Sequence, residues 1–189
     1  MARKNILFVI DYQNDFVDGS LGFPAAKALE DKLAEQIKFH INQGGTVVFT
    51  YDTHNRDYLE TTEGRNLPVE HCIDGTFGWQ LHGKVKEIHD WAVDNHKHIF
   101  DIRKPTFGSL GIINAIQDVM QYTGVAEEDL SMEFCGVVTN ICVISNIVVA
   151  KATAPEARIF VNSDLCASND TSLEEKAYDI IRNLHVDVI

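Results

Sequence analysis

The sequence predicts a single α/β domain, a three-layer α/β/α arrangement built on a six-stranded, mainly parallel sheet. Short and almost wholly apolar segments alternate with segments in which apolar residues recur every third or fourth position, a pattern typical of parallel strands joined by helices. The apolar segments lack the alternation of a half-exposed strand, so they suit strands buried on both faces. At 189 residues the chain is long enough for one well-packed domain. We therefore assign residues 1–189 to one domain.

In the first half of the chain, residues 6–10 and 46–51 are the strand candidates, and each is followed by an aspartate. Between them, Pro24 begins a predicted helix whose leucines and isoleucines recur every fourth residue until a glycine pair ends it. Helical spacing resumes over residues 79–91. The intervening segment 53–78 is rich in charged residues, threonine and glycine. A loop of this length in a compact domain is usually functional.

The second half of the chain continues the alternation without a linker or an internal repeat. Its predicted elements are a strand at 98–102, a helix at 109–122, a strand at 132–138, a helix capped by Thr139 and Asn140, a strand at 158–161, a helix at 172–183 and a strand at 186–189. Cys142 falls in the first turn of the capped helix, where free backbone N–H groups and the helix dipole lower the pKa of a thiol. A small buried residue at a tight junction is the alternative interpretation.

Composition and charge exclude several classes of protein. A net charge of -12 argues against nucleic acid or an anionic membrane surface as partner. The basic residues at the start of the chain precede an apolar run that ends at Asp11, too short for a secretion signal or a membrane span. The four cysteines form no C-x-x-C pair, so reduced thiols are expected. These observations predict a cytoplasmic protein, and the net charge leaves small neutral substrates open.

Reactive side chains follow four consecutive predicted strands. They are Asp11, Asp52 with His54, Lys104, and Cys142. Because the carboxyl ends of parallel strands share one edge, where such sheets bind ligands, we expect these side chains to lie close together. One polar residue after a strand is ordinary turn chemistry. Four such strands, with a lysine and a thiol among the residues, favour a functional site.

Three of these residues suit nucleophilic catalysis. Cys142 would be the nucleophile, and because a free thiol is mostly protonated at neutral pH it needs a base. Asp11 could accept the thiol proton and return it to a leaving group. Lys104 could stabilise both the Cys142 thiolate and the Asp11 carboxylate. The alternative interpretation is a lysine that lies on the protein surface. Backbone N–H groups of Val138 and Cys142 could bind the oxyanion of a tetrahedral intermediate.

Asp52 and His54, together with His71, suit a metal site. On an extended segment Asp52 and His54 point to the same side, and the long loop can return His71 to them. Two imidazoles and a carboxylate suit a divalent ion, with zinc expected and iron or manganese as alternatives. Either Glu60 or Glu63 could add an oxygen ligand. Solvated loop histidines without a metal are the alternative.

Motifs along nearly the whole chain also resemble those of a known family. They are Ile10-Asp11-Tyr12-Gln13-Asn14-Asp15-Phe16, Tyr51-Asp52-Thr53-His54, Leu67-Pro68-Val69-Glu70-His71-Cys72 with Gly75-Thr76 and Gly78, Lys104 with Phe107, Gly136-Val137-Val138-Thr139-Asn140-Ile141-Cys142-Val143, and Asp164-Leu165-Cys166-Ala167-Ser168. This set resembles the isochorismatase-like cysteine hydrolase superfamily, and most of all its nicotinamidase/pyrazinamidase branch. True isochorismatases typically lack the cysteine, so its presence favours amide hydrolysis.

The resemblance implies a Rossmann-like hydrolase fold and a role for each matching residue. Asp11, Lys104 and Cys142 match the catalytic triad. The metal ligands match Asp52, His54 and His71, with Glu63 a candidate for the carboxylate that some members add. Phe16 and Phe107 match the aromatic residues that sandwich the substrate ring. A non-proline cis peptide is implied between Val138 and Thr139.

The implied reaction is hydrolysis of nicotinamide to the acid and ammonia through a cysteine thioester, as in NAD salvage, by a homo-oligomer. Two features depart from the branch. Phe107 is followed by Gly108-Ser109-Leu110 where Ser-Ala-Phe is common, and Thr53 stands where tryptophan is frequent. The substrate therefore stays open between nicotinamide and another amide or carbamoyl compound, and a non-catalytic ligand-binding member of the fold is the remaining alternative.

Overall fold

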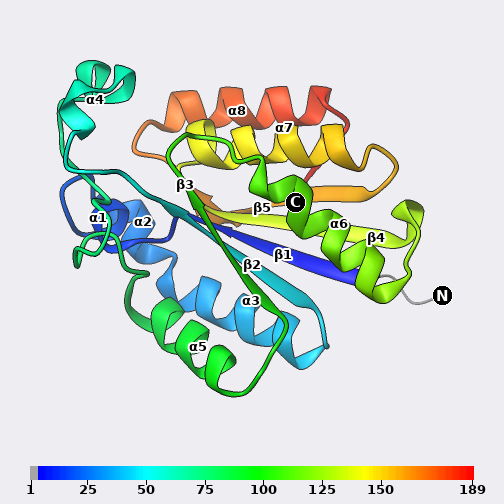
Figure 1. The fold of residues 1–189 in the computed structure, drawn as a ribbon. Coiled ribbons are helices and arrows are strands. Elements are labelled where there is room, and N and C mark those ends of the chain that lie inside the picture. Colours follow the sequence, from blue (N-terminus) through cyan, green and yellow to red (C-terminus); the bar gives the residue numbers. More distant parts are fainter. Residues whose placement is uncertain (1–3) are drawn as a thin grey trace.

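The computed structural model describes residues 4–189 and confirms the predicted three-layer architecture (Figure 1). The sheet consists of β1 (Lys4–Ile10), β2 (Thr46–Asp52), β3 (Ile99–Lys104), β4 (Leu130–Val137), β5 (Arg158–Ala167) and β6 (Asp187–Val188). All neighbouring strands are parallel, and their order is β3-β2-β1-β4-β5-β6. The chain therefore builds outward from β1 to β3 and then returns to the other side of β1. The β1–β4 boundary is the switch point at which such sheets bind ligands.

Helices cover both faces of the sheet (Figure 1). On one side are α3 (Glu30–Asn42) and α5 (Gly83–Asp94), and on the other are α6 (Gly111–Thr123), α7 (Ile144–Thr153) and α8 (Thr171–Asn183). Three helices are short, namely α1 (Asn14–Val17), α2 (Pro24–Ala28) and α4 (Thr62–Asn66). Residues of β1 alternate between two buried cores, which explains why that strand is apolar throughout. Among residues 4–189, no helix has the length and apolar character needed to cross a membrane.

Two helices differ from the predicted spans because of tertiary contacts and local breaks. The helix expected at 79–91 begins at Gly83, because Leu81 pairs in an isolated antiparallel bridge with Gln13. The helix expected from Pro24 is divided at Leu29 into α2 and α3. Residues 53–78, expected to be a loop, contain α4 and a short 3₁₀ turn.

The predicted cap at Thr139 and Asn140 is wrong. Thr139 Oγ1 donates a hydrogen bond to Glu174 Oε1 at 2.6 Å, and Asn140 Oδ1 accepts one from Ser168 Oγ at 2.6 Å. Residues 139–143 instead form one π-helical turn before α7. Side chains from α8 and from the segment after β5 thus hold this turn, in place of a local cap.

The cis peptide bond lies one residue earlier than the resemblance implied. It joins Val137 to Val138, and not Val138 to Thr139. Since β4 ends at Val137, the cis bond falls at the strand terminus itself.

Candidate active site

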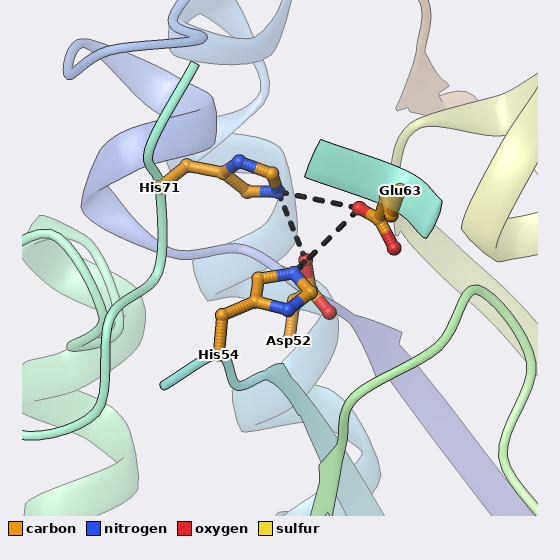
Figure 2. A group of neighbouring side chains, drawn as sticks. All are labelled: Asp52, His54, Glu63 and His71. Atoms are coloured by element: carbon orange, nitrogen blue, oxygen red, sulfur yellow. Dashed lines mark hydrogen bonds and ion pairs between the residues drawn. The ribbon is translucent and has the colours of Figure 1, made fainter. Parts of the chain in front are cut away.

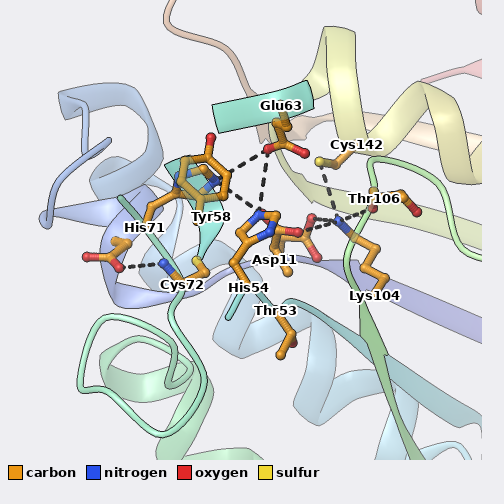
Figure 3. A network of polar contacts seen from close by, with 12 residues as sticks. Asp11, Thr53, His54, Tyr58, Glu63, His71, Cys72, Lys104, Thr106 and Cys142 are labelled. Carbon is orange, nitrogen blue, oxygen red and sulfur yellow. Dashed lines mark hydrogen bonds and ion pairs between the residues drawn. The ribbon is translucent and has the colours of Figure 1, made fainter. Parts of the chain in front are cut away.

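Asp11, Lys104 and Cys142 meet at the carboxyl-terminal edge of the sheet (Figure 3). Asp11 directly follows β1, Lys104 is the last residue of β3, and Cys142 lies in the π turn after β4. The Lys104 Nζ atom is 2.6 Å from Asp11 Oδ2 and 3.6 Å from Cys142 Sγ. The side chains of Asp11 and Lys104 have no solvent exposure, and Cys142 is 5% exposed. A base, a cation and a thiol therefore share one buried space.

Thr50 orients Asp11, a role that the sequence analysis missed. The Thr50 hydroxyl accepts a hydrogen bond from the Asp11 backbone N–H at 3.1 Å and donates one to Asp11 Oδ1 at 2.6 Å. Asp11 itself has a positive φ of 46°, an uncommon conformation that aspartate tolerates better than most residues. Its Oδ2 atom lies beside Lys104 without forming an aligned hydrogen bond. That oxygen therefore remains able to accept a proton.

Burial controls the protonation of the thiol. It raises the pKa of Cys142 well above the ordinary value, and the opposing effect of the Lys104 charge is smaller. The expected lowering of this pKa at a helix start is therefore wrong, because desolvation and the charges of Asp11 and Asp52 outweigh the cation. Burial also raises the pKa of Asp11, against the charge of Lys104. Burial thus favours the protonated thiol of Cys142, and it makes the carboxylate beside it a stronger base than an exposed aspartate.

Asp52, His54, Glu63 and His71 form a second cluster, shown in Figure 2. The Asp52 Oδ2 atom is 3.0 Å from His54 Nε2 and 3.3 Å from His71 Nε2. Glu63 Oε1 is 3.6 Å and 3.7 Å from the same two nitrogens. In a tetrahedral site with bonds near 2.1 Å, ligand atoms are about 3.4 Å apart. The four donor atoms therefore fit a divalent ion of that coordination.

Contacts around the cluster hold its donors in place. His71 Nδ1 donates a hydrogen bond to the Val69 carbonyl oxygen at 2.8 Å, so Nε2 is the ring nitrogen that faces the cluster. Burial alone would raise the pKa of Asp52, but hydrogen bonds from His54 and His71 and the charge of Lys104 hold it well below the ordinary value. Asp52 is therefore an anion, as a metal ligand must be.

The polar residues after Asp11 build the scaffold of this cluster. Gln13 accepts a hydrogen bond from the Asp52 N–H at 2.8 Å and donates to the carbonyl oxygens of Asp52 and Trp79 at 2.9 and 2.7 Å. Asp15 accepts the N–H of Cys72 at 2.7 Å. These bonds fasten both β2 and the long loop to the segment that follows β1, which holds His71 near Asp52. In the sequence, this role was indicated by the run of polar residues that follows Asp11.

The structure distinguishes the two candidate glutamates by position. The Thr61 side chain caps α4 by accepting the Gly64 N–H at 3.0 Å, and Glu63 in the first turn of that helix reaches the cluster. Glu60 ends the preceding 3₁₀ turn, is exposed and lies outside the cluster.

A cavity of about 920 Å³ opens beside the four-residue cluster, and Pro105 and Ile141, the chain neighbours of Lys104 and Cys142, also line it. His54, Glu63 and Phe107 form part of its wall. Phe16 is only 7% exposed and packs against the His71 ring, with ring centroids 5.4 Å apart, so it does not line this cavity. Another cavity of about 700 Å³, which includes Thr46, lies at the amino-terminal ends of the strands, away from these residues.

Comparisons with known proteins agree with this architecture. The family model described as the isochorismatase domain matches residues 5–189. The structure is similar to that of the pyrazinamidase/nicotinamidase from Streptococcus mutans UA159, with a TM-score of 0.82 and 24% identity over 98% of this chain and 100% of that chain. It is equally similar to the nicotinamidase/pyrazinamidase from Bacillus subtilis, with a TM-score of 0.82 and 25% identity over 98% of each chain.

A third similar structure is a pyrazinamidase of Pyrococcus horikoshii in complex with zinc, with a TM-score of 0.73 and 19% identity over 98% of each chain. No match was found among curated proteins.

Proposed function

This chain belongs to the isochorismatase family, and on that basis we propose that it is a metal-dependent amidase that hydrolyses nicotinamide and pyrazinamide-like amides to the acid and ammonia. One observation carries the proposal. The buried Asp11–Lys104–Cys142 group adjoins the four-donor cluster, since Lys104 Nζ is 3.6 Å from Asp52 Oδ1. A nucleophile and a site able to orient a substrate thus lie within one small volume. NAD salvage is the setting that this reaction suits.

In the proposed reaction Asp11 takes the proton from Cys142, and the sulfur attacks the carboxamide carbon. Lys104 offsets the negative charge that forms in the buried site. Backbone N–H groups of Val138 and Cys142 bind the oxyanion. Ammonia then leaves with the proton that Asp11 held, and a thioester remains. Asp11 next deprotonates water, which releases the acid and restores the thiol.

Asp52, His54, Glu63 and His71 are the residues that would hold a divalent ion, with zinc expected and iron or manganese as alternatives. A bound ion would supply a Lewis acid that positions the substrate. The shared contact of Lys104 with Asp11 and Asp52 fixes the two groups relative to each other. These residues therefore couple substrate orientation to the position of the thiol.

The Glu63→Gln substitution is expected to weaken zinc binding by at least about tenfold, because it removes a charged oxygen donor. Glu60→Gln is the matched control, since Glu60 lies three residues away and outside the cluster. Competition with a chromophoric chelator measures both affinities. Equal affinities in the two variants would remove Glu63 from the ligand set.

Ammonia release from nicotinamide by the metal-loaded protein tests the substrate. We expect turnover with nicotinamide and pyrazinamide, and little or none with N-carbamoyl amino acids. Release from the carbamoyl compounds alone would transfer the proposal to that class of substrate. The absence of release from any amide would favour a ligand-binding member of the family.

A further inference from the structure

We infer that the 920 Å³ cavity selects uncharged amides that carry an apolar substituent away from the scissile group, and rejects amides that carry a carboxylate. This inference rests on the proposed amidase function, because it places the reacting amide at Cys142. It adds a substrate class to that function.

The cavity is larger than a single-ring amide requires. Pockets for drug-sized ligands span about 300 to 1,000 Å³, and this one, at about 920 Å³, is near the upper end of that range. Its wall includes His54 and Glu63 of the cluster, and Ile141, the neighbour of Cys142. A substrate amide at the thiol would therefore leave most of this volume for the rest of the molecule.

Three apolar side chains from separate segments form part of the wall. Leu67 is 37% exposed, Phe107 45% and Ile141 36%. Exposed apolar side chains that gather in one concave surface mark ligand-binding sites. The hydroxyl of Thr53, which also lines the cavity, is occupied by bonds with Trp79 Nε1 at 2.9 Å and the Tyr51 carbonyl at 3.0 Å. With threonine where a larger tryptophan is frequent, this position also leaves room for a substituent.

Within residues 4–189, no lysine or arginine lines the cavity, whereas Asp57 and Glu63 do. Lys104 is buried and does not line the cavity, and its charge is paired with the carboxylates of Asp11 and Asp52. Arg65 is held outside by the Glu60 carbonyl and the Thr62 hydroxyl. Apart from the metal ion, which the proposed function assigns to positioning the substrate, the described residues of the wall offer no lysine or arginine. A carboxylate on the substituent would therefore lose its hydration without either side chain to pair with, which is unfavourable.

A matched series of amides tests this inference. The series contains nicotinamide, nicotinamides with a propyl group at each free ring carbon, and the corresponding carboxyethyl compounds. For the best ring position we expect kcat/KM for the propyl amide to exceed that for nicotinamide about tenfold, since apolar pockets discriminate by this amount for small groups. The carboxyethyl amide should fall at least about tenfold below the propyl amide. Hydrolysis of nicotinamide with rejection of every propyl amide would overturn the inference but not the amidase function.

Two variants test whether the apolar substituent of the substrate lies in this cavity. Leu67→Asp should lower the ratio of kcat/KM for the propyl amide to that for nicotinamide by about tenfold. Leu110→Asp is the control, because Leu110 is 76% exposed and lies outside the cavity. It should leave both values unchanged. An unchanged ratio in Leu67→Asp would show that the substituent does not occupy this cavity.

Binding separates failure of this inference from failure of the proposed function. Calorimetry with the Cys142→Ala protein measures the affinity of the same amides without turnover. Tighter binding of propyl than of carboxyethyl amides supports the cavity assignment even if the native protein hydrolyses none of them, in which case only the amidase proposal falls. Equal or reversed affinities overturn the inference.

Discussion

Replacing Cys142 with alanine is expected to lower kcat/KM for amide hydrolysis by at least about a thousandfold. The substitution removes the sulfur that would form the thioester, and among the described residues no other thiol contacts Lys104 Nζ. Because the side chain lies outside the metal cluster, zinc affinity should stay at the native value. Ammonia release and chelator competition measure the two quantities on the same preparation.

The matched control for this prediction is Cys135→Ala. Cys135 is also fully buried, but its sulfur contacts the Phe8 carbonyl oxygen at 3.4 Å in the sheet and not the active site. That variant should retain activity. Near-native turnover by Cys142→Ala would instead exclude Cys142 as the nucleophile.

Replacing Lys104 with methionine is expected to lower the free energy of unfolding by about 3 to 5 kcal/mol, and to abolish activity. The methionine preserves the apolar stem but leaves Asp11, whose side chain is completely buried, without its cationic partner. The cost is that of an unpaired buried charge, which greatly exceeds the net value of the ion pair itself. Urea denaturation measures the change, provided that the slope of the transition is unaltered.

The double variant Asp11→Asn/Lys104→Met tests whether the unpaired Asp11 carboxylate causes this loss of stability. With no carboxylate left at position 11, it should lose much less free energy of unfolding than the sum of the two single variants. A loss equal to that sum would show that Lys104 stabilises the fold by packing alone.

The pH dependence of the Lys104→Met protein should follow from Asp11. Burial already raises the pKa of this carboxyl in the native protein, and loss of the ammonium raises it further. A carboxyl whose pKa is higher in the folded than in the unfolded state destabilises the fold as pH rises through that range. The difference in unfolding free energy between native and variant proteins should therefore shrink as the pH is lowered. A difference that grows at acid pH would contradict this assignment.

Much of the fold could be predicted from local patterns. The strand at 6–10 was identified because every residue in it is apolar, and the structure buries alternate residues of β1 in two cores. The grouping of Asp11, Lys104 and Cys142 followed from topology, since residues that follow parallel strands meet at one edge. Asp52 and His54 share one side because side chains two apart on an extended segment do so.

The sequence by itself thus determined the order of the elements, the edge that carries the site and the types of side chain gathered there, because these depend on periodicity and chain order. Only the tertiary structure decided the rest. The raised pKa of Cys142, the support of Asp11 by Thr50 and the position of Glu63 beside Asp52, His54 and His71 arise between segments far apart in the chain. The same holds for the π turn, which Glu174 and Ser168 hold where a local cap was expected. Burial and long-range hydrogen bonds have no local sequence pattern, so they could not be predicted from neighbouring residues.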